Sequence, residues 1–473
     1  MNYTETNTTT QEYFVPECGV LFFDSGIPEF KQTEIASSLT KHVNFGTRRF
    51  PRIREIKLLV FSGILDISSD KVCPKCAKKM VKNGSLTVTL NHVPIGEMRS
   101  LIRVSYPRLR CLNNDCSFSS WSPKIPFKDK RHRITRALKD YTISLLEWGM
   151  TLKTAAFITG LDKMTVKSIH KELLKKKFTV NDKLIKPERQ ANYLAIDEFK
   201  LHNGYKYATV IIDLETGHIL YLAHGKKKAV VYDFIKHVGQ EWMAKVKAVS
   251  CDMNSNFEEA FKEKCPAIDI VYDHFHIIKN FNDKVITAVR KDEQRRLIEE
   301  GKDEEAAHLK KTKYIFMSKR STLIQKDNDA SAGKLVSKAG QLFNKPEFKA
   351  KGGNEDRYEN LLEENKLFFT IDFVKEQLDE AYKSTNEVEM CVRIQEIIDI
   401  CKDTNNNRFS WFARLLENHL QGIYTFARYH ISTGKLEGIN NKIKTERRQG
   451  YGYPDDEYFF LRLMECSRKK TRY

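Results

Sequence analysis

The stretch Tyr193-Leu194-Ala195-Ile196-Asp197-Glu198-Phe199 places a carboxylate at the end of an apolar run that is typical of a buried strand. A second apolar run, Ala248-Val249-Ser250-Cys251, ends in the same way at Asp252. A third acid, Glu437, stands shortly after Gly434, where a helix can begin. Hard divalent cations prefer oxygen ligands, so three converging carboxylates would hold Mg²⁺ on a phosphodiester. The three stretches therefore predict a metal site for phosphoryl transfer.

The segment around the first two acids has the pattern of an α/β domain. Its strands and helices follow the order β-β-β-α-β-α-β, which is the order of a ribonuclease-H-like core, where the first and fourth strands are neighbours. Asp197 and Asp252 would then lie side by side. An isolated Asp is more simply explained as a helix cap or turn residue, but two at the ends of apolar strands favour the metal site. The expected elements are strands 192–200, 205–214 and 218–224, helix 230–243, strand 246–251, helix 257–265 and strand 268–273.

The positive charge of the chain is concentrated in one region. The 473 residues carry a net charge of +18. Residues 124–189 contain 17 Lys and Arg against 7 Asp and Glu, a net of +10. Such a concentration indicates a polyanion partner, although a solvated helix face is the simpler alternative. A chain of this length is also expected to form two to four domains.

Four cysteines form two paired knuckles ahead of the basic region. Cys73 and Cys76 have C-x-x-C spacing, and Cys111 and Cys116 have C-x₄-C spacing. The residues between the two pairs alternate in polarity, as in Leu86-Thr-Val-Thr-Leu90. Two knuckles joined by β-hairpins are typical of a zinc ribbon with a closed tetrahedral site, so we expect a structural Zn²⁺. The alternative is four unrelated buried cysteines.

The basic region itself contains apolar residues at helical spacing. Helices are expected over 134–148, over 152–159 up to Gly160, and from about Thr165 onward. Trp148, like Trp242 and Trp411, is expected to be a core residue rather than a base-stacking one. The unit 152–177 is predicted to be a helix-turn-helix. The same geometry occurs in proteins that bind no DNA, but the local charge and the neighbouring zinc ribbon favour DNA binding. The side chains expected to reach phosphates or base edges are those of Lys163, Lys167, Ser168 and Lys171.

Several motifs occur in a fixed order along the chain. They are the Cys₄ knuckles, the helix-turn-helix, Ala195-Ile196-Asp197-Glu198, Cys251-Asp252-Met253, Asp273-His274-Phe275-His276-Ile277-Ile278-Lys279, Leu436-Glu437-Gly438-Ile439-Asn440-Asn441-Lys442-Ile443-Lys444 and Arg447-Arg448-Gln449-Gly450-Tyr451-Gly452-Tyr453. In this order they resemble the DDE transposases of bacterial insertion sequences, specifically the ISL-three group. The resemblance covers residues of about 70–290 and 405–465.

The resemblance implies a mechanism and a set of partners. Asp197, Asp252 and Glu437 would form a triad that holds two Mg²⁺ or Mn²⁺. In each step one cation would activate the nucleophile and the other would stabilise the leaving oxygen. Water would first cut the element's end to expose a 3′-OH, which would then attack target DNA. The expected partners are the inverted-repeat ends of a mobile element and target DNA, bound by a homodimer.

Other residues near the triad have less certain roles in the sequence. His276 could contact substrate or a carboxylate, or be a structural histidine. Arg447 and Arg448 follow the catalytic helix, where contact with phosphate is expected. Glu198 should point to the opposite face of its strand from Asp197. Glu446 is the next acid in the same stretch and is the alternative to Glu437.

The fold class that follows is a multidomain chain with an N-terminal zinc ribbon, an all-α helix-turn-helix and an α/β ribonuclease-H-like catalytic core with an all-helical insertion. Residues 327–355 within the insertion are expected to form a loop. A polar N-terminus and the lack of a long apolar run predict a cytoplasmic protein without a membrane partner, and the resemblance implies a bacterial, nucleoid-associated one. Two alternatives stay open, a nuclease or resolvase on the same core and a non-catalytic DNA-binding regulator. The expected domains are 1–69 (role unknown), 70–122 (zinc ribbon), 130–180 (helix-turn-helix), 190–282 (first part of the core), 283–405 (insertion) and 406–473 (last part of the core).

Overall fold

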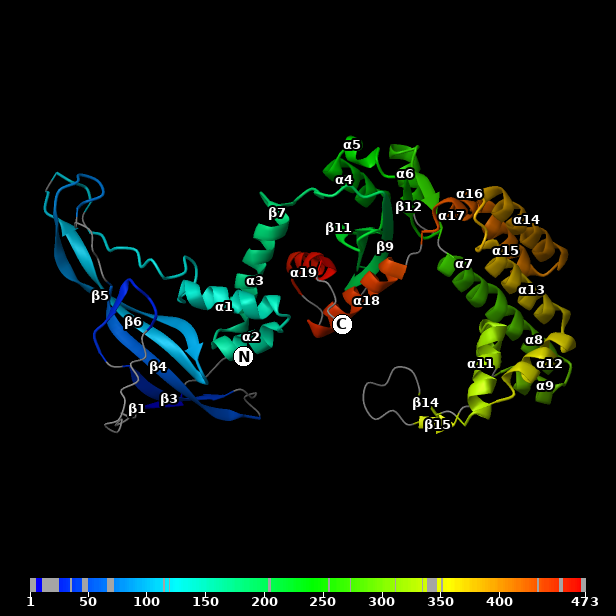
Figure 1. Ribbon diagram of the computed structural model, residues 1–473, viewed down its shortest axis with the longest axis horizontal. Coiled ribbons are helices and arrows are strands. Elements are labelled where there is room, and N and C mark those ends of the chain that lie inside the picture. Colours follow the sequence, from blue (N-terminus) through cyan, green and yellow to red (C-terminus); the bar gives the residue numbers. More distant parts are fainter. Residues whose placement is uncertain are drawn as a thin grey trace. The chain divides into compact units, whose positions relative to one another are not determined.

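The chain folds into two compact units, Met1–Asp182 and Lys183–Tyr473, which are drawn in Figure 1. No described helix is both long enough and apolar enough to cross a membrane. The computed structural model describes residues 6–10, 25–34, 36–44, 50–65, 72–113, 115–118, 120–202, 206–253, 256–272, 274–310, 312–333, 335–337, 347–349, 352–431, 434–450 and 454–468.

The first unit is built on a six-stranded sheet. Its longest pairing is the antiparallel hairpin of β5 and β6, and β6 also pairs in parallel with β4. Phe61 on β4 and Ile102 on β6 are fully buried in the same cluster. Residues 1–69, for which the sequence suggests no motif, therefore supply strands to the sheet that contains the cysteine-bearing hairpin. The strands are β1 (Thr6–Thr10), β2 (Phe30–Gln32), β3 (Ser37–Asn44), β4 (Ile53–Leu65), β5 (Met80–Ile95) and β6 (Met98–Cys111).

Three helices follow the sheet, at the positions expected from the sequence. They are α1 (Arg136–Glu147), α2 (Leu152–Thr159) and α3 (Lys163–Phe178). Each begins after a residue whose side chain caps the first turn, namely Thr135, Thr151 and Asp162. Gly160 ends α2 with a left-handed φ of 72°.

Trp411 is 37% exposed, and the prediction that Trp148 is a core residue is also wrong. Its side chain is 76% exposed. The reason is that α1 ends at Glu147, so Trp148 forms its C-cap and no longer follows the apolar face of the helix.

The second unit contains a five-stranded sheet in the order β11-β10-β9-β12-β13. The first three strands in the chain form an antiparallel meander, and β12 is parallel to both β9 and β13. The expected helix 230–243 is interrupted, because Gly239 has a φ of 96° and separates two helices. The elements are β9 (Tyr193–His202), β10 (Lys206–Asp213), β11 (Ile219–His224), α4 (Lys228–Val238), α5 (Gln240–Met243), β12 (Ala248–Ser250), α6 (Asn256–Lys264) and β13 (Asp269–Val271).

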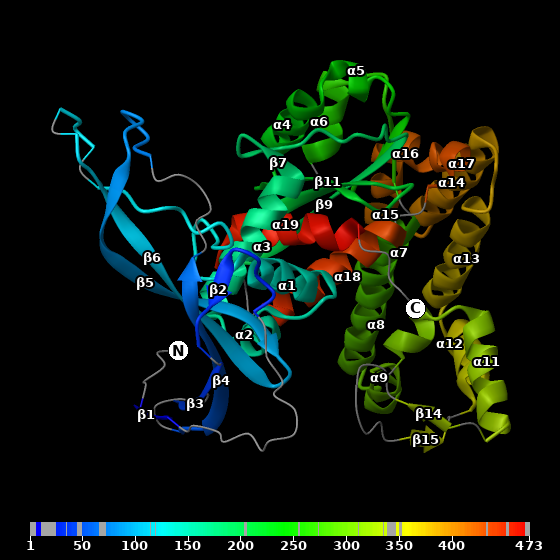
Figure 2. The ribbon, with the colours of Figure 1, turned by 60° about the vertical axis from the view of Figure 1, so that its left-hand side comes forward.

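Helices cover both faces of this sheet. Figures 1 and 2 show α4 and α6 on one side and α18 (Gly434–Gln449) and α19 (Asp456–Arg468) on the other. Ile196 on β9 shares a buried cluster with Phe234 on α4 and Phe261 on α6. Because side chains alternate along a strand, Asp197 points to the opposite face, where α18 lies.

Between β13 and α18 the chain forms a set of helices and two short strands. The expected loop 327–355 is shorter than predicted, since α11 (Arg320–Ser331) extends into it. The insertion is also not all-helical as predicted, because two short strands within that stretch, β14 (Leu335–Ser337) and β15 (Glu347–Lys349), pair antiparallel. The other elements are α7 (His274–Asn280), η1 (Phe281–Ile286), α8 (Thr287–Glu299), α9 (Asp303–Leu309), α10 (Lys313–Met317), α12 (Asn354–Glu364), α13 (Lys366–Ala381), α14 (Glu387–Asp403), α15 (Asn407–Asn418), α16 (Leu420–Tyr424) and α17 (Phe426–Tyr429).

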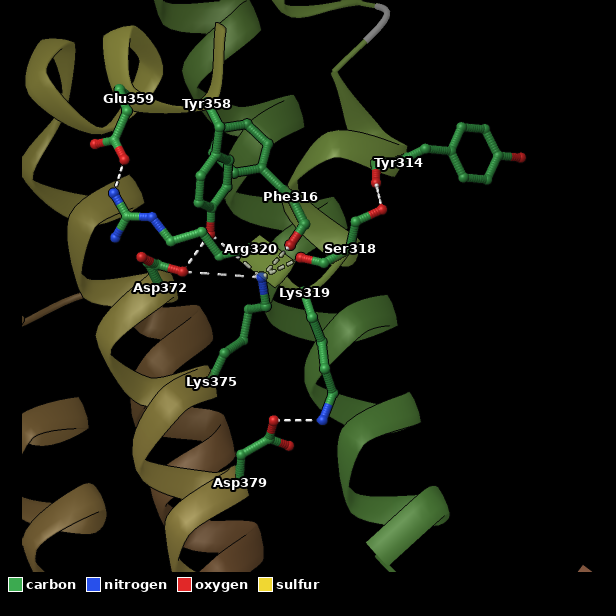
Figure 3. A network of polar contacts seen from close by, with 10 residues as sticks. All are labelled: Tyr314, Phe316, Ser318, Lys319, Arg320, Tyr358, Glu359, Asp372, Lys375 and Asp379. Carbon is green, nitrogen blue, oxygen red and sulfur yellow. Dashed lines mark hydrogen bonds and ion pairs between the residues drawn. The ribbon is translucent and has the colours of Figure 1, made fainter. Parts of the chain in front are cut away.

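A buried polar network holds part of this insertion together, as Figure 3 shows. Lys375 on α13 donates to the carbonyl oxygens of Phe316 and Ser318, each at 2.8 Å. It also donates to the Tyr358 hydroxyl at 3.3 Å, and Tyr358 in turn donates to the Asp372 carboxylate. Burial lowers the pKa of Lys375. The network joins the turn between α10 and α11 to helices α12 and α13, so these hydrogen bonds hold the helices together.

Candidate active site and metal centre

The register of the central sheet brings Asp197 and Asp252 together. In the parallel pair of β9 and β12, Ala195 is the partner of Ser250. Asp197 follows Ala195 by two residues, and Asp252 follows Ser250 by two residues. The two aspartates therefore lie at matching positions along neighbouring parallel strands, near the carboxyl end of β12. Asp252 is close enough to raise the pKa of Asp197.

Asp197 is a partly buried carboxylate whose two oxygens both accept hydrogen bonds. Oδ1 accepts from the backbone N–H of Glu198 at 2.7 Å, and Oδ2 accepts from Nδ2 of Asn440 at 2.6 Å. Burial raises the pKa of Asp197 overall, since it outweighs the lowering by these two donors and by His276. A bound cation would offset both the burial and the repulsion from Asp252, so this pair has the electrostatics of a cation site.

Glu437 lies on helix α18, which contacts Asp197 at the end of β9 through Asn440. It lies in the first turn of α18 and is exposed, and Asn440 is about one turn further along. Because Asn440 contacts Asp197, Glu437 lies on the side of α18 that faces the end of β9. Within the part of the chain that is described, the three carboxylates do not form a set with all ligand atoms within 4.8 Å.

Glu446, the alternative acid on α18, has a structural environment instead. Its Oε2 lies 3.4 Å from Nε of Arg462, and its Oε1 accepts from the Cys466 thiol at 3.1 Å. Only 15% of the Glu446 side chain is exposed. It follows Glu437 by two and a half helical turns, which places it on the opposite side of α18. Glu446 therefore joins α18 to α19, and Glu437 is the better candidate for the third acid.

His276 and Glu198 flank the two aspartates in different ways. His276 lies in the first turn of α7, and its Nδ1 is 3.7 Å from Oδ1 of Asp252. That distance allows electrostatic support of Asp252 but is too long for a good hydrogen bond. Glu198 is exposed and lies 3.5 Å from Lys226, away from the aspartate pair.

The two arginines at the end of α18 differ from each other. Arg447 donates to the backbone carbonyl of Lys200 on β9, so it helps to hold α18 against the sheet. Arg448 is exposed at the last turn of the helix. Of the pair, Arg448 is the better candidate for contact with phosphate.

The four cysteines meet at the open end of the β5–β6 hairpin. Their sulfur atoms all lie within 4.8 Å of one another, with 3.6 Å between Cys76 and Cys111 and 3.9 Å between Cys73 and Cys116. Four sulfurs at about 2.3 Å from a tetrahedral Zn²⁺ are separated by about 3.8 Å, which matches these distances. The arrangement therefore fits a closed structural zinc site.

Backbone turns and electrostatics support that site. Ala77, with a φ of 55°, donates from its N–H to the Cys73 carbonyl at 2.9 Å, and Cys116 donates to the Asn113 carbonyl at 3.0 Å. The backbone N–H of Lys78 lowers the pKa of the Cys76 thiol to about 6, whereas burial and the neighbouring thiols raise the pKa of Cys111 to about 11. The Cys76 thiol therefore ionises readily, and a zinc ligand must be a thiolate.

The predicted DNA-contacting residues lie along α3. Lys163, Lys167 and Lys171 recur every fourth residue and so share one side of the helix, with Ser168 next to them. Lys163 is exposed at the start of the helix, while Lys167, Ser168 and Lys171 are partly exposed. The helix is anchored through Val166 and Ile169, both fully buried.

One residue of the site, Asn440, is missing from the sequence-based prediction. Its hydrogen-bond partner Asp197 lies 243 residues away in the chain, so no local pattern points to the pair. The available signal is its spacing of three residues from Glu437, which places both on one face of a helix.

Comparisons with known proteins identify the family of the chain. A family model described as a transposase, that of the ISL-three (ISL3) group, matches residues 194–463, more than half of the chain. A model described as the zinc-finger of transposase IS204/IS1001/IS1096/IS1165 matches residues 70–116. The first match includes Asp197, Asp252 and Glu437, and the second includes all four knuckle cysteines.

Curated relatives are also transposases. The chain is 25% identical over 393 residues to the transposase for insertion sequence element IS1001 of Bordetella parapertussis, which covers 83% of this chain and 87% of the relative. It is 29% identical over 85 residues to the transposase for insertion sequence element IS1557 of Mycobacterium tuberculosis, which covers 18% of this chain and 19% of the relative. The chain therefore belongs to the ISL-three group of transposases and carries the zinc ribbon of that group in its N-terminal unit.

Proposed function

We propose that this transposase binds the inverted-repeat ends of an insertion sequence, cuts DNA there and joins the new 3′-OH to target DNA. The observation that carries the proposal is the pair Asp197 and Asp252 at one level of the sheet, with Glu437 on the helix bonded to Asp197. The strand order supports a ribonuclease-H-like core. We assign residues 190–282 and 406–473 to that core and 283–405 to its helical insertion.

Asp197, Asp252 and Glu437 are proposed to hold two Mg²⁺, or Mn²⁺ in their place. The donor set fits such cations, because it consists of carboxylates, and a cation would offset the burial and the repulsion from Asp252 that raise the pKa of Asp197. When bound, the cations would activate the attacking water or 3′-OH and stabilise the leaving oxygen.

The protein's own part is to fix these carboxylates before DNA arrives. Two hydrogen bonds orient Asp197, and the end of β12 positions Asp252 beside it. Glu437 is exposed on α18 and is proposed to complete the site when cations and DNA bind. Because water and the 3′-OH can attack in line at the same site, no covalent protein–DNA intermediate is needed.

We further propose that the first unit recognises the element's ends. Helices α2 and α3, joined by the tight turn at Gly160, have the layout of a helix-turn-helix whose second helix carries the lysine row. The concentrated positive charge of residues 124–189 supports contact with the DNA backbone. Two copies of the chain, one on each end, would form the proposed homodimer.

Lysine substitutions on α3 test this recognition role in the full chain. Lys167→Ala and Lys171→Ala should each weaken binding to element ends. If the contact is to phosphate, the log–log salt slope of binding should flatten by about 0.9 for each lysine, whatever the sequence. If it is to a base edge, discrimination against mutated ends should fall by roughly 1–3 kcal/mol at one position. Fluorescence anisotropy over a range of salt concentrations measures both quantities.

Lys262→Ala is the control for these variants, because Lys262 is an exposed lysine of the second unit that pairs with Glu258. It should leave both affinity and salt slope unchanged. Unaltered end binding by both α3 variants would place recognition elsewhere.

A strand-transfer assay with pre-cut ends separates the proposed function from its rivals. A transposase joins a pre-cut 3′-OH end to plasmid DNA in the presence of Mg²⁺. A nuclease or resolvase on the same core would cut DNA without joining, and a non-catalytic regulator would bind without either reaction. Joined products above the no-enzyme background are the expected result.

A further inference from the structure

Asn440 has one buried side-chain atom for which the described residues provide no hydrogen-bond partner. Its Nδ2 donates to Oδ2 of Asp197, but its Oδ1 is buried and accepts no hydrogen bond from any described residue. A buried amide oxygen without a donor is unfavourable, so such atoms in native proteins call for a ligand or water.

The orientation of the amide follows from its partner. Turning the Asn440 amide over would place its oxygen against the Asp197 carboxylate, where neither group could donate. The bond to Asp197 therefore fixes the unsatisfied oxygen in place beside the carboxylates. Asn440 also lies about one turn after Glu437 on α18, so both side chains occupy the same face of the helix.

We propose that Asn440 is a positioning residue of the cation site, whose Nδ2–H orients Asp197 and whose Oδ1 accepts a hydrogen bond from a water on the bound cation. This inference rests on the proposed function. Mg²⁺ usually keeps several waters in proteins, and those waters need acceptors. Groups that hydrogen-bond to metal ligands commonly change metal affinity by about 10–100-fold when removed.

The test measures Mn²⁺ affinity of the full-length protein without DNA, by isothermal titration calorimetry. Asn440→Ala should weaken Mn²⁺ binding by about 10–100-fold. The matched control is Asn441→Ala, the same change at the next, exposed position of the same helix. It should bind Mn²⁺ within about twofold of wild type.

Thermal unfolding with and without Mn²⁺ distinguishes a role at the cation site from a purely structural role. Ligand binding raises the melting temperature according to its affinity, so the Mn²⁺-induced increase should be smaller in Asn440→Ala than in wild type. A purely structural asparagine would change the melting temperature without Mn²⁺ and leave that increase intact. Wild-type Mn²⁺ affinity in Asn440→Ala would overturn the inference, whatever its stability.

Asp197→Asn separates this inference from the proposed function. If Asp197→Asn loses Mn²⁺ binding but Asn440→Ala does not, the triad stands and the role of Asn440 is wrong. If neither variant changes Mn²⁺ binding, the cation site itself is wrong, and the inference fails with it.

Discussion

Asp197→Asn, Asp252→Asn and Glu437→Gln should each lower DNA cleavage and strand transfer by at least about 10²–10³-fold, because each change keeps side-chain shape but removes a charge needed to hold a catalytic cation. Specific binding to element ends should persist, since it is assigned to the other compact unit. The measurement is a gel assay of cleavage and of strand transfer with pre-cut ends, alongside anisotropy for DNA binding.

Glu198→Gln is the matched control for the triad. Glu198 is adjacent to Asp197 in the chain, but it is exposed and lies near Lys226 rather than the aspartates. It should retain near-wild-type activity. A triad variant that cleaves normally would remove that residue from the site. In particular, activity in Glu437→Gln together with its loss in Glu446→Gln would make Glu446 the third acid, against its pairing with Arg462.

Cys76→Ser and Cys116→Ser should remove zinc and unfold the knuckle end of the β5–β6 hairpin. The four cysteines form a small cluster with few apolar neighbours, so little else holds this end together. Structural zinc contributes an apparent binding free energy of about 10–16 kcal/mol in small zinc-finger peptides. Elemental analysis should find one zinc per wild-type chain, and binding to element ends should fall in both variants.

The control is Cys391→Ser, the same change at a partly exposed cysteine on α14 of the second unit. It should keep one zinc per chain and wild-type unfolding behaviour. The chain has two compact units, and the zinc ligands all lie in the first. Loss of zinc should therefore lower the melting temperature of the first unit more than that of the second. A well-folded wild-type preparation without zinc would contradict the zinc assignment.

Local patterns predicted several of the strands and helices well. The strand around Asp197 and the helix α2 were both predictable because each has a clear period and clear end signals, such as Thr151 and Gly160 for α2. Gly239 shows the limit of this approach. A helical pattern of apolar residues continues past it, but its positive φ breaks the helix.

Long-range contacts account for most of what the sequence could not predict. The parallel pairing of β4 with β6 joins residues about forty positions apart, such as Leu59 and Ser100, and no local pattern encodes it. The bond of Asn440 to Asp197 and the pairing of Glu446 with Arg462 likewise depend on how α18 lies against its neighbours. Composition and spacing alone left Glu437 and Glu446 as alternatives, and burial now favours Glu437.

Electron paramagnetic resonance of bound Mn²⁺ tests the central claim most directly, because it reports on the cations themselves. In the full-length protein on pre-cut end DNA, the account predicts two Mn²⁺ per active site with the dipolar coupling of ions about 3.5–4 Å apart. That coupled signal should be lost in Asp197→Asn and in Asp252→Asn. An unchanged coupled signal in both variants, or Mn²⁺ that binds only as isolated ions in the wild type, would contradict a two-cation site on these carboxylates.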